Sequence, residues 1–160
     1  MITSLEINKA LNAKIKHALV KSEFKFVEIV ASDLSEPIIR PSIKVFLDDD
    51  SGGKMNSCMK EQTLKCKVYF FASDLRKYKI ENSKVKDLIK NEFLTPLKIS
   101  DSFVIDIDEI EAEISDTVLI LSFDIETLEN IPDEILDEGI DYEMMEELDI
   151  NLENEEAFNS

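Results

Sequence analysis

Three groups of side chains in this sequence are of types that could do chemistry: one histidine, two cysteines and several short runs of carboxylates. His17 is the only histidine, and Cys58 and Cys66 are the only cysteines. Structural zinc takes four nitrogen or sulfur ligands, and these residues supply three. No serine or cysteine motif accompanies His17. We therefore expect neither a zinc site nor nucleophilic catalysis, and interpret His17 as a surface or flanking residue of a helix.

The two cysteines belong to no C-x-x-C pair. Cys58 and Cys66 fall eight residues apart in one strand-like stretch, and hence on the same face of it. Eight residues of extended chain span about 26 Å, which is too far for a disulfide within one strand. The spacing predicts two reduced thiols, buried or half-buried, and fits synthesis in the cytoplasm.

Two clusters of carboxylates invite a metal or an acid–base interpretation. Asp48-Asp49-Asp50 precedes Gly52, but a calcium loop counted from Asp48 needs an acidic residue at its fifth position and Glu at its twelfth, where Gly52 and Met59 stand. We expect 48–53 to form a solvated loop. The chain shows no glycine-rich nucleotide loop and no nucleophile elbow.

Glu109, Glu111 and Glu113 alternate with apolar residues, which places three carboxylates on one face of a predicted strand. Catalytic carboxylate pairs sit in clefts with aromatic walls, whereas this chain has no Trp and its three Tyr lie elsewhere. The alternation favours a wet sheet face, or an acidic lumen in an oligomer. We predict no enzyme activity and no cofactor.

Charge is distributed very unevenly along the chain. All 18 Lys and Arg precede Ile99, so residues 1–98 carry a formal +5 and residues 99–160 carry −22 of the net −17. The excess negative charge of residues 99–160 must be solvated, pair with the basic residues of 1–98, or contact a positively charged partner. The lysines at 84, 86, 90 and 98 offer only a small basic surface, so we expect no specific nucleic-acid binding. No apolar run exceeds five residues, and we expect no membrane span and no signal peptide.

The elements that position these groups follow from hydrophobic periodicity. A helix is predicted over 2–21, with an uncertain start near Ser4. Short strands are predicted within 24–30 and 42–47, and another in 57–72 after a hairpin loop. A second helix is expected to begin near Ser83 and end before Pro96, followed by strands over 102–107, 109–114 and 118–125. The predicted core-facing residues of the first helix and the last strand are Leu5, Leu11, Ile15, Ala18, Leu19, Leu119, Leu121, Phe123 and Ile125.

This order, α-β-β-β-α-β-β-β, predicts an α+β fold with a mainly antiparallel sheet and two helices packed on it. We assign residues 1–127 to that domain and 128–160 to an acidic C-terminal extension, helical or extended, with 151–160 disordered. Tyr142, Met144, Met145 and Leu148 are apolar residues within the acidic run. They either pack on their own domain or anchor the chain to a neighbouring subunit, since Met suits adaptable interfaces.

Several short motifs resemble a known family. Glu36-Pro37, Pro41-Ser42-Ile43-Lys44-Val45, Lys67-Val68-Tyr69-Phe70 and Asp116-Thr117-Val118-Leu119-Ile120 together are similar to the tail terminator family of phages and phage-tail-like bacteriocins. The likeness covers residues 1–127. Members often carry Asp-Gly before the last strand, where this chain has Thr117, and the acidic extension lies outside the common pattern.

The resemblance implies a structural protein that forms a hexameric ring on the end of a tail tube. Such a ring stops polymerisation of the tube, and of the sheath if the tail is contractile, and offers a docking surface for a head-tail connector or collar. The expected place is a virion or phage-tail-like particle, assembled in the bacterial host cytoplasm. Two alternatives remain open: an acidic DNA mimic, and an adaptor that binds a basic partner.

Overall fold

The computed structural model describes residues 1–30 and 37–137. It has the α+β architecture that the sequence predicts. The helices are α1 (Ser4–Val20), α2 (Tyr78–Glu92) and α3 (Asp133–Asp137). The strands are β1 (Glu28–Ile29), β2 (Ser42–Lys54), β3 (Met59–Phe71), β4 (Leu97–Ser100), β5 (Phe103–Ile105), β6 (Glu111–Ser115) and β7 (Val118–Asn130). The element order departs from the expected one by β4, which was not predicted, while the short α3 lies in the extension expected to be helical or extended.

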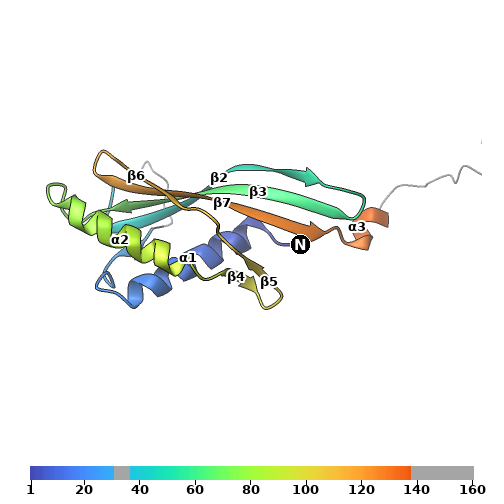
Figure 1. The fold of residues 1–160 in the computed structure, drawn as a ribbon, viewed down its shortest axis with the longest axis horizontal. Helices are drawn as coiled ribbons and strands as arrows, with labels where there is room; N and C mark the ends of the chain where they lie inside the picture. The colour runs from blue at the N-terminus through green and yellow to red at the C-terminus, as the bar shows by residue number, and fades with distance from the viewer. Residues whose placement is uncertain (31–36, 138–160) are drawn as a thin grey trace, which may run out of the picture.

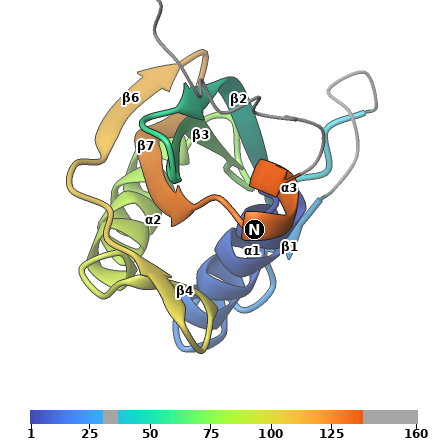
Figure 2. The ribbon, with the colours of Figure 1, turned by 90° about the vertical axis from the view of Figure 1, so that its right-hand side faces the viewer.

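Five strands form the main sheet in the order β1-β2-β3-β7-β6. Only β1 and β2 run parallel, while the remaining neighbours are antiparallel. β4 and β5 pair with each other as a separate hairpin rather than joining the sheet. The molecule is elongated along β2, β3 and β7, with α1 and α2 on one face of the sheet (Figure 1). Seen from the end, the sheet arches over the two helices, and no described helix covers its outer face (Figure 2).

The core lies between the sheet and the helices. β7 buries Leu119, Leu121, Phe123 and Ile125, as its alternation predicts. They pack with the even-numbered residues of β3, because Leu121 pairs with Val68 in the antiparallel register. Successive side chains on a strand point to opposite faces, so the odd-numbered residues of β3 and the even-numbered residues of β7 form the outer face.

α1 begins at Ser4, two residues after the start of the predicted helix. Thr3, and not Ser4, is the N-cap, and it forms a capping box with Glu6. The Glu6 carboxylate accepts from the Thr3 backbone N–H at 2.8 Å, while the Thr3 hydroxyl accepts from the Glu6 backbone N–H at 3.3 Å. Ile7, in register with the buried Leu11 and Ile15, is a core residue, whereas Leu5 is 63% exposed, contrary to the predicted apolar face.

The predicted loop at 48–53 is wrong, because β2 continues to Lys54. A bulge between Asp48 and Ser51 absorbs the extra residues, after which Ser51 pairs with Thr63. Asp50 accepts a hydrogen bond from the Gln62 side chain at 2.9 Å. Cross-strand pairing thus overrides the turn propensity of the Asp and Gly residues, and the reversal falls at Met55–Cys58.

Two further expectations need correction. α2 begins at Tyr78, one and a half turns before Ser83, which is exposed within the helix. β1 holds only two of the residues predicted as a strand, since the segment before it folds as a turn. No helix in the described ranges is long and apolar enough to span a membrane.

Candidate assembly surfaces

β6 forms one edge of the sheet, and all five of its residues are exposed. Glu111 and Glu113 pair with Ser122 and Ile120 of β7, so both carboxylates lie on the outer face. Glu109 precedes the strand, and the three glutamates therefore do not share one strand face as predicted. The opposite face of β6 is also open, since Ile114 is 54% exposed.

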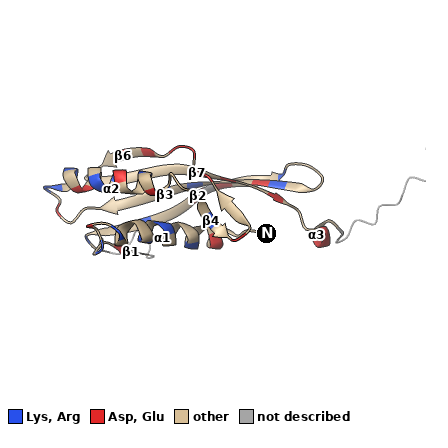
Figure 3. Ribbon diagram, turned by 60° about the horizontal axis from the view of Figure 1, so that its bottom comes forward, with Lys and Arg blue, Asp and Glu red and all other residues tan. Residues whose placement is uncertain are grey.

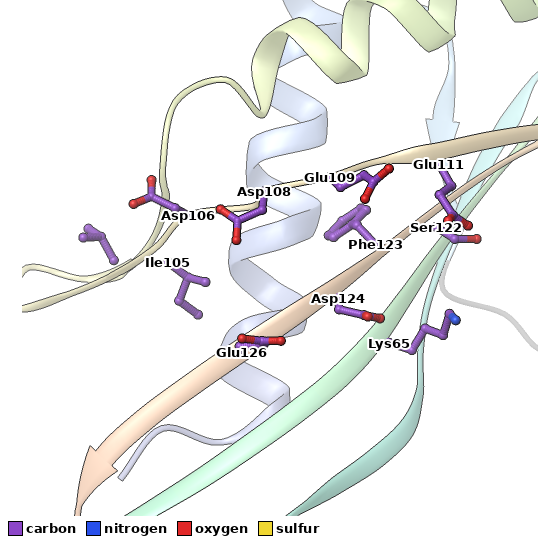
Figure 4. Close-up of a pocket in the computed structure, with 11 residues that line it drawn as sticks. Lys65, Ile105, Asp106, Asp108, Glu109, Glu111, Ser122, Phe123, Asp124 and Glu126 are labelled. Carbon is purple, nitrogen blue, oxygen red and sulfur yellow. The ribbon is translucent and has the colours of Figure 1, made fainter.

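An acidic groove of about 450 Å³ lies where the chain leaves β5 and approaches β7. Figure 4 shows Asp106, Asp108 and Glu109 on this connection, facing Asp124 and Glu126 of β7 across the groove, with Glu111 at its end. Lys65 of β3 is the one cation among the described residues that line it. Among the described residues, no three His, Cys, Asp or Glu side chains converge as a metal site. This acidic groove can attract a cationic surface.

Two columns of opposite charge lie side by side on the outer face of the sheet. The basic column is Lys65 and Lys67 on β3. The acidic column is Glu111, Glu113, Asp124 and Glu126 on the adjoining β6 and β7. Lys65 stands directly opposite Asp124 in the register. A surface with both signs side by side can meet a copy of itself or a partner only in a defined orientation.

A second groove, of about 640 Å³, lies between α2 and β6. Ala112, Ile114 and Leu119 form its apolar side, and Lys79 and Lys86 of α2 form its rim. Glu113 of β6 also lines it, so the charged side chains of its lining sum to +1. We call it the α2–β6 groove. It differs from the acidic groove in both polarity and charge.

Asn82 fixes the walls of the α2–β6 groove. Its side chain is fully buried, and its amide nitrogen donates to the Thr117 carbonyl at 3.0 Å. Thr117 and Asp116 form the two-residue turn between β6 and β7, and both have positive φ, 72° and 46°. The hydrogen bond thereby ties α2 to the turn and sets the spacing of helix and edge strand.

His17 lies where the prediction places it, on an exposed flank of α1. Its Nδ1 is 2.8 Å from the Glu92 carboxylate, with 54% of the His17 side chain exposed. Lys14 on the same helix donates to the Thr95 hydroxyl at 2.8 Å and to the Pro96 carbonyl at 3.1 Å. These contacts join α1 to the end of α2.

The two cysteines are free thiols, as expected, but they do not share a face. Cys58 is exposed in the hairpin turn, and Cys66 is buried in the core of β3. Burial in apolar surroundings, with a smaller effect of Asp48, raises the pKa of the Cys66 thiol far above its ordinary value. Tyr142, Met144, Met145 and Leu148 lie outside the described residues.

Taken together, the described residues define a small α+β subunit with an open sheet face, an exposed edge strand and two grooves of opposite character. Comparison with known proteins names its class. A family model described as phage tail terminator protein matches residues 6–137, so the chain belongs to the phage tail terminator family. No curated protein matches the chain.

Membership of this family gives the protein a structural role in a phage tail. It is a tail completion protein that associates with other tail components and forms part of the virion tail. The family is one of structural proteins rather than enzymes.

Proposed function

We propose that this protein closes as a hexameric ring on the end of a tail tube and stops its polymerisation. The observation that carries the proposal is the family match over residues 6–137. The ring also ends a sheath where the tail is contractile, and its free side receives a head-tail connector or collar. The protein acts without catalysis or cofactor, within a virion or phage-tail-like particle assembled in the host cytoplasm.

The unlike ends of the subunit support a terminating role. Lysines gather on α1 and α2, whereas α3 and the approach to β6 are acidic (Figure 3). Copies joined head to tail bring such unlike surfaces together, and contacts of this heterologous kind close a ring when the rotation permits. A ring of unlike sides occupies the tube end with one side and presents a different surface on the other. The next ring of tube subunits then has no matching surface to bind.

The net charge suits a passage for DNA. Six copies at −17 carry a formal −102. If Glu109, Glu111 and Glu113 face the lumen, the carboxylates repel DNA phosphates and a genome slides instead of adhering. The domain boundary at 127 and the anchoring role of the acidic extension belong to the same proposal.

Tails assembled with and without this protein test the proposal. Without it, electron microscopy should show tubes of uncontrolled length, and adding the purified protein should restore a fixed length. Light scattering of the ring released from tails should give about 110 kDa, six times 18.3 kDa. Tubes of normal length in its absence, or a strict monomer that ignores tubes, would exclude the function.

The acidic groove favours one alternative, an adaptor or DNA mimic that binds a basic partner. In that case, neutralising Asp106, Asp108 and Glu109 with amides should abolish capture of a basic host protein while tube length stays controlled. If the protein is a tail terminator instead, neither the wild type nor this variant should capture a host protein.

A further inference from the structure

We propose that the α2–β6 groove receives the acidic segment 138–160 of a neighbouring copy. The inference rests on the proposed ring, because it needs a second copy beside the first. It assigns an occupant to a surface that the described residues leave open, and it gives the acidic extension a role as a strap between subunits.

The groove offers the chemistry that such a segment needs. Its floor is apolar, with Ile114 54% exposed and Ala112 exposed beside it. Its rim carries Lys79 and Lys86, and Lys79 makes no ion pair with a described carboxylate. Lys86 has only Asp87, at 4.0 Å. An occupant with apolar side chains and several carboxylates would satisfy both features.

Residues 138–160 have that composition. These 23 residues hold nine Asp and Glu and no Lys, Arg or His. Apolar residues are distributed among the carboxylates: Ile140, Tyr142, Met144, Met145, Leu148, Ile150 and Leu152. Charge complementarity therefore favours this segment over the basic front of the chain, and a flexible Met pair adapts to a shallow apolar floor.

The path of the chain favours a neighbouring copy. β7 begins at the groove and carries the chain through 13 residues to the other end of the molecule, where α3 follows (Figure 1). The described chain thus ends about 40 Å from its own groove, at 3.3 Å per residue of strand. The 23 residues reach up to about 75–80 Å when extended, which is ample to cross into an adjacent subunit.

A return to its own groove would be electrostatically unfavourable. The segment would have to run back beside β7, along the acidic groove formed by Asp106, Asp108, Glu109, Asp124 and Glu126. The nine carboxylates of the segment would pass these five at close range and repel them along the whole path. The α2–β6 groove of the next copy can be approached from outside without that passage.

Site-directed cross-linking in assembled particles tests the strap. Two full-length variants, both with Cys58→Ser to remove the exposed native thiol, carry Ala112→Cys in the groove or Met145→Cys in the extension. Particles assembled from an equal mixture are oxidised and analysed on a non-reducing gel. We expect a linked species of two chains, about 37 kDa from twice 18.3 kDa.

Two controls make the result specific. Leu94→Cys, 82% exposed just beyond α2, replaces Ala112→Cys and should link only at background level. Lys79→Glu with Lys86→Glu, added to the Ala112→Cys chain, should lower the yield roughly fivefold or more, since two ion pairs are reversed.

Several outcomes overturn the strap. Equal linking of Leu94→Cys and Ala112→Cys does so, and so does linking of Met145→Cys to a tube subunit. A chain carrying both cysteines that links only within itself, and runs as a single chain, overturns it as well. Tube length in the same particles reports on the proposed function separately. Normal lengths without the cross-link would refute the strap alone, whereas uncontrolled lengths would refute the terminator role.

Discussion

At the scale of single residues, the turn at Asp116 and Thr117 stores backbone strain. A β-branched residue at φ 72° is unusual, and the left-handed region costs an L-residue roughly 1–2 kcal/mol. Thr117 also buries a hydroxyl oxygen that has no hydrogen-bond partner in the described chain.

Thr117→Gly should therefore stabilise the protein. Relief of the strain exceeds the extra unfolded-state entropy of glycine, about 0.4–1 kcal/mol, and leaves a net gain of about 1 kcal/mol. For a chain of this size, that gain raises Tm by about 2–4 °C. Calorimetry would measure it. Thr117→Ala keeps a Cβ at the same φ and is the matched control, and a glycine variant less stable than the alanine variant would contradict the explanation.

Glu6 makes the start of α1 sensitive to pH. Hydrogen bonds from the backbone and side chain of Thr3 lower its pKa below the ordinary 4.5. A carboxyl whose pKa falls on folding contributes stability above its unfolded pKa, and that contribution is lost as pH falls through the folded value.

Glu6→Ala should accordingly destabilise the protein at neutral pH but make little difference well below pH 4.5. Urea unfolding of both proteins across this range would show the two stabilities converging as the pH drops. As a control, Thr3→Ala removes the N-cap itself and should cost about 1 kcal/mol. A constant gap between wild type and Glu6→Ala at every pH would exclude the carboxylate as the cause.

At the scale of elements, the long β2–β3 hairpin depends on close backbone packing at one glycine. A Cβ added at Gly52 would lie 2.8 Å from the Gln62 Cα and would also collide with the Glu61 carbonyl oxygen. Both are backbone atoms, so neither can rotate away. At Gly53, a Cβ would meet nothing within 4 Å.

Gly52→Ala should thus cost about 1–3 kcal/mol, the usual range for forced overpacking. Gly53→Ala should stay within about 0.5 kcal/mol of wild type. Urea unfolding of the two variants side by side separates a steric effect from the general loss of a glycine. Equal costs at both positions would show that the clash is relieved by movement of the strand.

The elements differ in how far the sequence could reveal them. β7 and most of α1 were predictable, because each presents a regular apolar period to one core. The extension of β2 through Asp48–Gly53 was not, since its pairing with β3 is set by tertiary contact and opposes local turn propensity. Ser83 misled the prediction for α2 for a similar reason: the helix starts at Tyr78 without any side-chain cap, so no capping signal existed to find.

The candidate surfaces were predictable only in part. Alternation alone placed Glu111 and Glu113 on one face, and the structure puts both there. The acidic groove required the register of β7 against β3, which joins Asp124 to Lys65 across almost 60 positions of sequence. The α2–β6 groove depends on the hydrogen bond from Asn82 to Thr117, and no sequence pattern announces such a contact.

At the scale of the whole molecule, the charge predicts behaviour toward DNA. With a net −17 and its lysines confined to the first 98 residues, the protein repels phosphate on average. We expect no retention of duplex DNA in a mobility-shift experiment, even at low salt, where electrostatic attraction would be strongest. A basic protein of similar size serves as positive control. A shifted band that weakens as salt rises would show instead that the α1 and α2 lysines form a phosphate-binding face.

The sheet has two long strand edges, along β2 and along β7, that bear on how free subunits behave. No described strand pairs with β2 beyond Ile43, or with the far side of β7 beyond Ser122. Bare margins of this length ordinarily recruit identical molecules into fibrils. In this protein Asp48 and Asp50 place negative charge on the β2 edge, and Asp124 and Glu126 place it on the β7 edge. The bulge between Asp48 and Ser51 also interrupts the regular hydrogen bonding of β2. We expect these negative charges to disfavour edge-to-edge pairing of unassembled subunits.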